Sequence, residues 1–283
     1  MDALVDTAWL AGELGDGDLR VLDAAYFANF PGEAPRDAAA EHDAAHIPGA
    51  LFLDLGTLRD TDSDLPMMLP DADLFAERLS ALGVAEADRI VLYDNSPHHT
   101  AARAWWMLTL FGATNVAILD GGLAKWRAEG RPVRSGRETS PRRSFTARRD
   151  GGAVRSLVQM RENLNSRAEQ AVDARSPARF SGAEPDPRPG TDAGHIPGSI
   201  NLPYGRLFHP DGTWKRGEPL RAAFADAGVA LDRPLVATCG SGITAAVLAF
   251  GAHLLGHDMP IYDGSWSEWG SHADTPKATT PAA

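Results

Sequence analysis

The chain has 283 residues and a formal net charge of −11, and 43% of its residues are hydrophobic and 23% are charged. This length and composition are ordinary for a globular protein and suffice for two domains of about 140 residues, each with a core of its own. An acidic surface repels phosphate groups, so we expect neither a nucleic acid nor a membrane surface as a partner. No apolar run approaches the roughly 20 residues that cross a bilayer.

Two further observations concern location. The first residues lack the basic start and the apolar core of a secretory signal. The chain has a single cysteine, Cys239, which cannot form an internal disulfide. Because a free thiol stays reduced in the cytosol, we expect a cytoplasmic protein whose thiol is either inert or chemically used.

In chain order, the segments predict alternating helices and strands. DLFAERLSALG, residues 73–83, has apolar residues at helical spacing and a terminal glycine. RIVLYD, which begins at Arg89, and PLVATC, which begins at Pro234, are short apolar runs that end in a loop, as buried parallel strands do. TAAVLAFGAHLLG, residues 244–256, is apolar on nearly all sides and predicts a buried helix. The alternation predicts the α/β class, with a mainly parallel sheet covered by helices on both faces.

Four motifs occur twice, in the same order and at a near-constant offset of about 145 to 150 residues. The pairs are RVLDAAYF and AVDARSPARF, HIPGALFLDL and HIPGSINLPY, RIVLYD and PLVATC, and LDGGLAKW and YDGSWSEW. We therefore expect two tandem copies of one domain, residues 1–135 and residues 157–283. The intervening residues 136–156 are rich in Arg, Gly, Ser and Pro and predict an exposed linker, with a basic docking patch as the alternative.

Cys239 stands where the strand PLVATC meets the following helix, in a loop that continues with Gly240, Ser241, Gly242, Ile243 and Thr244. Glycines let a backbone curl tightly, and such a curl turns successive N–H groups inward. With the partial positive charge of the helix N-terminus, these groups favour a thiolate of lowered pKa and would stabilise a persulfide on it. The alternative is a buried cysteine that only packs. A phosphatase loop needs an arginine at the position of Ala245, so phosphate chemistry is poorly supported.

The first half of the chain supplies an internal comparison. Alignment of RIVLYD with PLVATC places Asp94 at the position of Cys239. A carboxylate cannot carry a transferable sulfur. We therefore expect the first copy to be non-catalytic and the active site to belong to the second copy.

Together these motifs resemble those of the two-domain rhodanese-type sulfurtransferases. The resemblance covers nearly the whole chain and rests on the doubled domain, on HIPG in each copy and on YDGSWSEW after the cysteine loop. Within that family the closer match is to the 3-mercaptopyruvate sulfurtransferases, whose loop reads CGSGVTA where this chain has CGSGITA. Thiosulfate enzymes of the family carry an Arg-Lys pair at the positions of Gly240 and Ser241, which holds a doubly charged donor.

The resemblance also assigns residues that bind the donor. RFSGAEPDPR matches the segment in which mercaptopyruvate enzymes hold the donor carboxylate, and it places Arg179 and Arg188 on the two binding arginines. Arginine suits this role because it binds a carboxylate through two parallel hydrogen bonds, although either arginine alone could be a solvated surface charge. The Ser-His-Asp arrangement proposed for the family falls on Ser241, His46 and Asp37. Packing or capping is the alternative role of His46.

What the resemblance implies is a two-step sulfur transfer that needs no organic cofactor. The Cys239 thiolate would take sulfur from 3-mercaptopyruvate and pass it from a persulfide to an acceptor thiol, a thioredoxin-like protein or cyanide. Two alternatives remain, a thiosulfate:cyanide sulfurtransferase of the same fold and a persulfide carrier for a partner protein. His98 and His99 have no cluster of ligand residues around them, so we expect no metal. Five tryptophans are expected in the cores: Trp105, Trp106, Trp126, Trp266 and Trp269.

Overall fold

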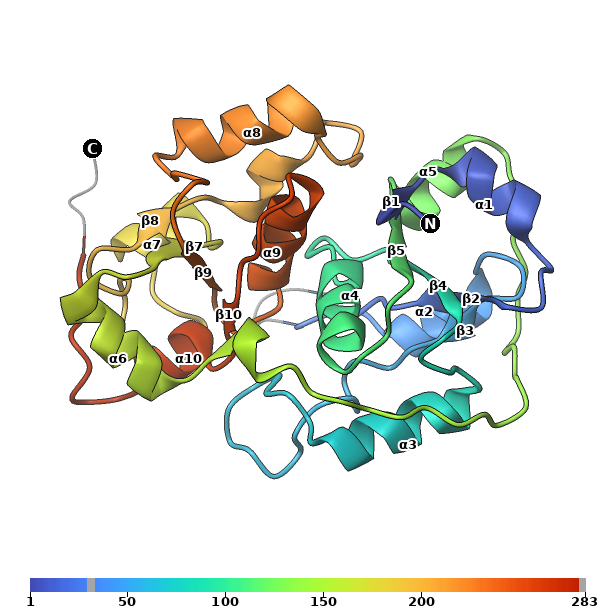
Figure 1. The fold of residues 1–283 in the computed structure, drawn as a ribbon, viewed down its shortest axis with the longest axis horizontal. Coiled ribbons are helices and arrows are strands. Elements are labelled where there is room, and N and C mark those ends of the chain that lie inside the picture. Colours follow the sequence, from blue (N-terminus) through green and yellow to red (C-terminus); the bar gives the residue numbers. More distant parts are fainter. Residues whose placement is uncertain (30–33, 280–283) are drawn as a thin grey trace. The chain divides into compact units, whose positions relative to one another are not determined.

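The computed structural model describes residues 1–29 and 34–279, which form two compact units. Unit 1 comprises Met1–Thr61, Leu69–Asp150 and His209–Trp214, and unit 2 comprises Asp62–Met68, Gly151–Phe208 and Lys215–Ala283. Figure 1 follows the chain by colour, from blue to green through most of unit 1 and from yellow-green to red through most of unit 2.

The sheet of unit 1 is parallel throughout. Its strands in spatial order are β1 (Leu4–Val5), β5 (Val116–Leu119), β4 (Arg89–Tyr93), β2 (Leu19–Asp23) and β3 (Leu51–Phe52). Its helices are α1 (Thr7–Glu13), α2 (Ala38–Ala44), α3 (Ala72–Leu82), α4 (Ala101–Leu110) and α5 (Gly122–Ala128). Four consecutive residues of β4, from Ile90 to Tyr93, are fully buried. Because successive side chains of a strand point to opposite faces, both faces of this sheet are covered.

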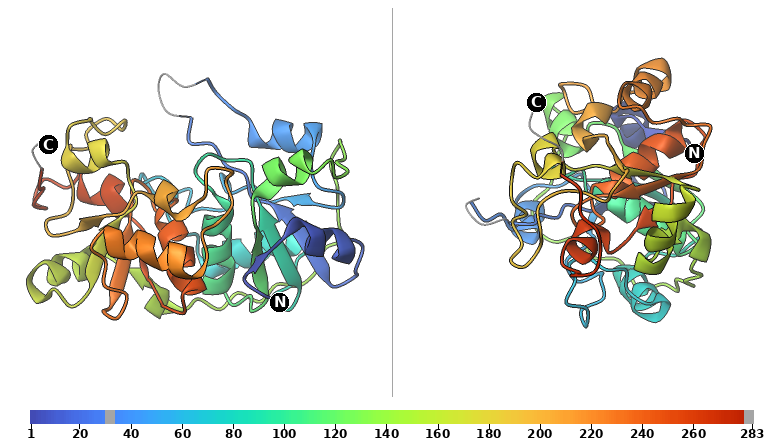
Figure 2. Two further views of the ribbon diagram at one scale, coloured as in Figure 1. Left: turned by 90° about the horizontal axis from the view of Figure 1, so that it is seen from above. Right: turned by 90° about the vertical axis from the view of Figure 1, so that its left-hand side faces the viewer.

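Unit 2 repeats this plan with its own parallel sheet. Its strands in spatial order are β6 (Val154–Arg155), β10 (Ile261–Tyr262), β9 (Leu235–Thr238), β7 (Gln170–Asp173) and β8 (Ile200–Asn201). Its helices are α6 (Leu157–Ser166), α7 (Pro177–Ser181), α8 (Gly217–Asp226), α9 (Ala245–Leu254) and α10 (Ser265–Trp269), with short 3-10 turns η1 (Gly151–Ala153) and η2 (Tyr204–Leu207). Figure 2 shows helices flanking the strands of each unit.

The expected α/β class is confirmed, because both sheets are parallel and their strands follow the same spatial order. The helix predicted at residues 73–83 is α3, which ends at Gly83 with a left-handed φ of 81°. The predicted buried helix is α9, whose residues from Ala245 to Ala252 are all buried. All five tryptophans expected in the cores are buried. In the part of the chain that the structure describes, no helix has the length and apolarity needed to cross a bilayer.

The segment before Gly151 is more firmly attached than its composition indicates. Most side chains between residues 131 and 150 are exposed, as in the predicted linker. However, Arg134 pairs with His46 in an isolated antiparallel bridge, and Phe145 is 4% exposed with its ring 5.6 Å from that of Phe75. One apolar residue, a few backbone hydrogen bonds and ion pairs such as that of Arg143 with the buried carboxylate of Asp88 therefore fix a segment whose composition is that of a solvated linker.

Candidate active site

Cys239 begins the loop between β9 and α9, and 1% of its surface is exposed. Cys239 directly follows β9, the middle strand of its sheet. The thiol therefore lies at the carboxyl edge, where open parallel sheets bind ligands. Gly242 adopts a left-handed φ of 80°, a value that favours glycine. This turn places its N–H group 3.1 Å from the sulfur of Cys239. The loop thus directs a backbone dipole at the sulfur.

The start of α10 anchors the cysteine loop through three hydrogen bonds. The N–H of Cys239 donates to Oγ of Ser265 at 3.2 Å. The N–H of Trp266 donates to the carbonyl of Cys239 at 3.0 Å, and the N–H of Ser267 donates to that of Gly240 at 2.9 Å. These three residues belong to the repeated motif YDGSWSEW. The repeat marked the motif in the sequence, but its role as the anchor of the loop was missed.

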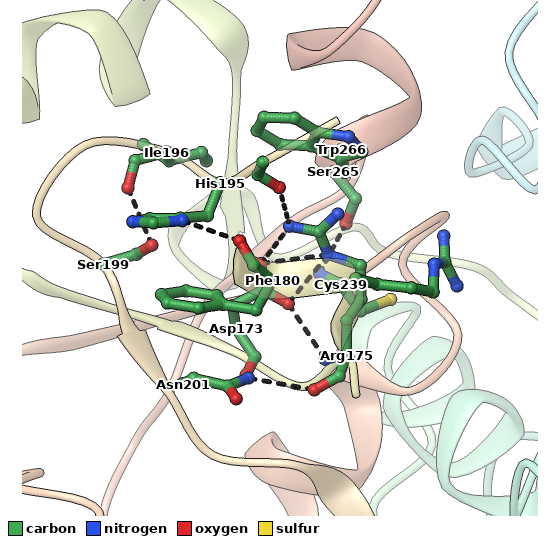
Figure 3. A network of polar contacts seen from close by, with 12 residues as sticks. Asp173, Arg175, Phe180, His195, Ile196, Ser199, Asn201, Cys239, Ser265 and Trp266 are labelled. Carbon is green, nitrogen blue, oxygen red and sulfur yellow. Dashed lines mark hydrogen bonds and ion pairs between the residues drawn. The ribbon is translucent and has the colours of Figure 1, made fainter. Parts of the chain in front are cut away.

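A buried ion pair supports Trp266, and Figure 3 shows it beside Cys239. The Arg175 guanidinium donates to the carboxylate of Asp173 at 2.7 to 3.1 Å and to the carbonyl of Gly194 at 2.8 Å. Its central carbon lies 4.5 Å from the ring of Trp266. Because both side chains of the pair are at most 2% exposed, loss of either would leave an uncompensated buried charge. The pair therefore packs against the indole of Trp266, whose backbone N–H makes one of the three hydrogen bonds that anchor the loop.

The two arginines predicted to bind the donor lie beside the cysteine loop. Arg179 is on α7, and Arg188 is in the loop that follows this helix. A Cβ atom added at Gly240 would lie 3.3 Å from Nη2 of Arg179 and 3.3 Å from Nη1 of Arg188. Both guanidinium groups thus adjoin the residue directly after the thiol. Unit 2 brings together a thiol and two cations within the reach of a small anionic molecule.

Asp186 joins the two arginines, and the sequence reasoning missed it. Its Oδ2 accepts a hydrogen bond from Nη2 of Arg179 at 2.6 Å, and its Oδ1 accepts one from Nη1 of Arg188 at 3.2 Å. Only 1% of the Asp186 side chain is exposed. The motif RFSGAEPDPR does show an acidic residue between the two arginines, but it does not show that the carboxylate of this residue is directed at both of them.

The second HIPG segment fixes the helix that carries Arg179. The ring of His195 stacks on that of Phe180 with a centroid distance of 3.8 Å, and its Nδ1 lies 2.7 Å from the carbonyl oxygen of Phe180. These contacts appear in Figure 3, where His195 lies against Phe180. Since Phe180 follows Arg179 directly, His195 holds the backbone from which that arginine extends.

The proposed Ser-His-Asp residues are divided between the units, with Ser241 in unit 2 and both His46 and Asp37 in unit 1. Asp37 is the N-cap of α2 and accepts the N–H of Ala40 at 3.1 Å. The buried ring of His46 stacks on that of His42 at 4.3 Å, and its Nδ1 lies 2.9 Å from the carbonyl oxygen of His42. Within the described part of unit 1, no hydrogen bond or ion pair joins Asp37 to His46. A catalytic role for the three residues stays a prediction.

Asp94 occupies the corresponding place in unit 1, directly after the middle strand β4. Its carboxylate accepts hydrogen bonds from the N–H groups of Ser96 at 2.9 Å and Ala101 at 2.7 Å. Burial raises the pKa of Asp94 to about 7, against the opposing effect of these two hydrogen bonds. The backbone N–H groups of the unit 1 loop therefore bind the carboxyl group of the loop's own first residue.

Tyr204 is a further residue of unit 2 that the sequence did not single out. It is half-buried at the start of η2. Its pKa is raised, first by burial and then by the negative charge on Cys239. The phenol therefore lies within electrostatic range of the thiol.

The arrangement suits an anion better than a metal. In the described ranges 1–29 and 34–279, no group of three or more His, Cys, Asp or Glu side chains could hold a metal ion. The groups around Cys239 are backbone N–H donors and guanidinium groups, which bind anions.

Comparison with known proteins agrees with this geometry. The model of the rhodanese-like domain matches residues 6–129 and again residues 156–272. The chain is 42% identical to the 3-mercaptopyruvate sulfurtransferase of Homo sapiens over 94% of its length and 91% of the relative's. The crystal structure of SseA from Escherichia coli, described as a 3-mercaptopyruvate sulfotransferase, superposes with a TM-score of 0.85 at 36% identity, covering 94% of this chain and 99% of that one. The chain belongs to the rhodanese-like family, with two such domains in tandem.

Relatives with different donors are equally similar to this chain. The thiosulfate sulfurtransferase of Cricetulus griseus is 43% identical over 94% of this chain and 91% of the relative. Overall identity therefore does not separate the two donor classes.

Proposed function

We propose that this chain is a sulfurtransferase that takes sulfur from 3-mercaptopyruvate and passes it, through a persulfide on Cys239, to an acceptor. The observation that carries the proposal is the convergence of Arg179 and Arg188 on Gly240, directly after the buried thiol. A keto acid with one carboxylate needs such an anchor to present its sulfur to Cys239. In this proposal residues 157–283 form the catalytic domain, residues 1–135 a non-catalytic one, and residues 136–156 the linker, whose end contributes β6 to the sheet of unit 2.

The first step is a nucleophilic attack of the Cys239 thiolate on the donor sulfur. A sulfur–sulfur bond forms, and the carbon–sulfur bond of the donor breaks. The electron pair stays on carbon as the enolate of pyruvate, which takes up the proton that the donor thiol releases. The N–H of Gly242, which already lies 3.1 Å from the sulfur, supports a role of the loop from Gly240 to Thr244 in stabilising the persulfide anion.

The second step returns the enzyme to its thiolate form. An acceptor thiolate or cyanide attacks the outer sulfur of the persulfide, the sulfur–sulfur bond breaks, and its electron pair returns to Cys239. A low-molecular-weight thiol or a thioredoxin-like protein would serve as well as cyanide. Ser241, His46 and Asp37 would assist proton movement in this scheme. A cytoplasmic location would keep the thiol reduced between cycles.

The second candidate is a thiosulfate:cyanide sulfurtransferase, which the similarity to the thiosulfate enzyme of Cricetulus griseus favours. The neutral residues at Gly240 and Ser241 weigh against it, since they add no cation to the two arginines that a donor with a single carboxylate already requires. A persulfide carrier for a partner protein would not need the two arginines.

Steady-state turnover with 3-mercaptopyruvate and with thiosulfate, each at a fixed concentration of cyanide, tests the proposal. We expect a higher kcat/KM for 3-mercaptopyruvate. The intact mass of the protein after treatment with the donor alone should increase by one sulfur atom, and Cys239→Ser should not show this increase. A higher kcat/KM for thiosulfate would establish the second candidate, and a mass increase without turnover would indicate a carrier.

A further inference from the structure

The carboxylate of Asp186 lies between the guanidinium groups that adjoin the thiol. Each of its oxygens accepts from a different arginine, Oδ2 from Arg179 at 2.6 Å and Oδ1 from Arg188 at 3.2 Å. The side chain of Asp186 is 1% exposed, whereas those of Arg179 and Arg188 are 17% and 20% exposed. The acid is thus almost fully buried, while the two cations that it joins remain partly exposed.

The backbone around Asp186 is restricted, and it contributes a hydrogen bond to the carboxylate. Asp186 stands between Pro185 and Pro187. A residue before proline is confined to extended conformations, and proline itself has a fixed φ. In addition, the N–H of Arg188 donates to Oδ1 of Asp186 at 3.0 Å and closes a tight turn. The position of the negative charge is therefore set by the chain as well as by its ion pairs.

The charge of this group matters for the donor. Two guanidinium groups and one carboxylate carry a net charge of +1, and the negative charge of the Cys239 thiolate is the same whichever donor binds. The two cations lie 3.3 Å from the position of a Cβ at Gly240. A monoanionic donor neutralises this charge, whereas a dianionic donor brings one negative charge too many close to a buried carboxylate. Charges separated by a few ångströms in a partly buried site interact strongly, because water screens them poorly.

We propose that Asp186 determines the charge of the donor that the site accepts: it offsets one of the two arginines and so favours a monoanionic keto-acid thiol over a dianionic sulfur donor. The same carboxylate orients both guanidinium groups, because it accepts hydrogen bonds from the two nitrogens nearest to Gly240, Nη2 of Arg179 and Nη1 of Arg188. This inference rests on the proposed function, since it concerns the choice between donors at the same thiol.

The test is the ratio of kcat/KM for thiosulfate to kcat/KM for 3-mercaptopyruvate in Asp186→Asn, a variant of nearly the same shape that lacks the charge. We expect the ratio to rise about tenfold over the wild type at low salt, mainly through a lower KM for thiosulfate. The rise should shrink as ionic strength increases. Asp186→Glu keeps the charge and should hold the ratio within about twofold of the wild type.

Glu184→Gln is the matched control, because it removes the same charge from an exposed position two residues earlier in the chain. We expect it to leave the ratio unchanged. A rise in Glu184→Gln equal to that in Asp186→Asn would overturn the inference, since overall charge would then explain the effect. An equal loss on both donors in Asp186→Asn, with no change in the ratio, would also overturn it and leave Asp186 a structural role only.

A second neutral variant and a second measurement guard against misfolding. Asp186→Ser replaces Asp186→Asn if the latter does not fold, with the same expectation for the ratio. Competitive inhibition by sulfate, a dianion, and by pyruvate, a monoanion, reports the same preference without sulfur transfer. In both neutral variants the inhibition constant of sulfate should fall relative to that of pyruvate. An unchanged ratio of the two inhibition constants would contradict the inference. A wild type that is inactive with both donors would overturn the proposed function, whereas an active wild type with an unmoved ratio would overturn only this inference.

Discussion

The loops after β4 and after β9 show the same backbone plan used for two different side chains. Each follows the middle strand of a parallel sheet and leads into a buried helix, α4 in unit 1 and α9 in unit 2. In unit 1 the N–H groups of Ser96 and Ala101 bind the carboxylate of Asp94. In unit 2 the N–H of Gly242 points to the sulfur of Cys239. A cradle of backbone dipoles is therefore a property of the repeated fold, and its first residue decides whether it holds a fixed carboxyl group or a nucleophile.

The buried aspartates of the two units, Asp23 and Asp173, also have different partners. Asp23 at the end of β2 accepts from Nδ1 of His42 at 3.0 Å. The corresponding residue of unit 2, Asp173, instead binds the guanidinium of Arg175, which also lies against Trp266. In unit 2 this buried pair reaches Trp266, in the helix that anchors the loop. The comparison teaches that both copies keep an aspartate at the end of the corresponding strand and pair it with a different basic side chain, a histidine in unit 1 and an arginine in unit 2.

Replacement of the nucleophile tests the comparison most severely. Cys239→Ser should lower sulfur transfer below about one per cent of the wild type, because a hydroxyl cannot hold a labile sulfur. Turnover with 3-mercaptopyruvate and cyanide measures this loss. Asp94→Asn, a substitution at the corresponding position of unit 1, is the control and should retain activity within about threefold. Transfer by a folded Cys239→Ser protein at several per cent of the wild-type rate would show that another group carries the sulfur.

Removal of either donor-binding arginine should have the next largest effect. Arg179→Ala and Arg188→Ala should each lower kcat/KM for 3-mercaptopyruvate by about ten- to a hundredfold, the equivalent of about 1.5–3 kcal/mol for a charge-assisted hydrogen bond. Arg221→Ala, which removes an arginine that is 48% exposed on α8, should have no comparable effect. An uncharged sulfur donor should lose much less than the keto acid. Equal losses with both kinds of donor would mean that the arginines do not bind the carboxylate.

The sequence predicted those parts of the site that local patterns determine. Cys239, its glycine loop and the helix behind it are contiguous, and Arg179 and Arg188 lie in one short motif. The repeat predicted two copies of one domain, and the alternation of strands with helices predicted a mainly parallel sheet in each. These features follow from residues that are neighbours in the chain.

The remaining parts depend on contacts between distant segments. Ser265 meets Cys239 across 26 residues, and a hydrogen bond of that kind leaves no periodic signal. Phe145 could not be recognised as a buried anchor, because the residues around it are those of a solvated linker. The orientation of Asp186 toward both arginines follows from a turn that composition alone does not specify.

Ser265 allows the anchor of the cysteine loop to be tested separately from the thiol. Ser265→Ala removes the acceptor for the N–H of Cys239, and an unmet hydrogen bond of this kind is worth about 1 kcal/mol. We expect kcat/KM to fall about three- to tenfold for 3-mercaptopyruvate and thiosulfate alike, since the loop serves both donors. Ser267→Ala is the matched control, because its hydroxyl donates only to the carbonyl of Gly264 and its backbone N–H still binds Gly240. An equal loss in the two variants would indicate general damage to α10.

Asp94→Asn gives the smallest expected effect on activity and the clearest effect on stability. The pKa of Asp94 in the folded protein is raised to about 7 by burial, whereas an unfolded aspartate titrates near 4. The folded state therefore binds this proton more tightly, and the stability that it contributes is present below about pH 4 and is lost as the pH rises through about 7. Asparagine does not titrate, so the melting temperature of the variant minus that of the wild type should increase by a few degrees between about pH 4 and pH 7.5.

The difference in melting temperature between Asp94→Asn and the wild type also has a part that does not depend on pH. An asparagine side chain accepts the N–H of Ser96 but presents its own N–H₂ to the N–H of Ala101, which lowers stability by the same amount at every pH. The slope against pH, measured by thermal unfolding in matched buffers, thus reports the carboxyl group alone. A difference that stays flat from pH 4 to pH 7.5 would show that Asp94 is ionised throughout and that its two hydrogen bonds outweigh burial. The unit 1 loop would then hold an anion as the unit 2 loop is proposed to do, and the contrast between the copies would be confined to the identity of that anion.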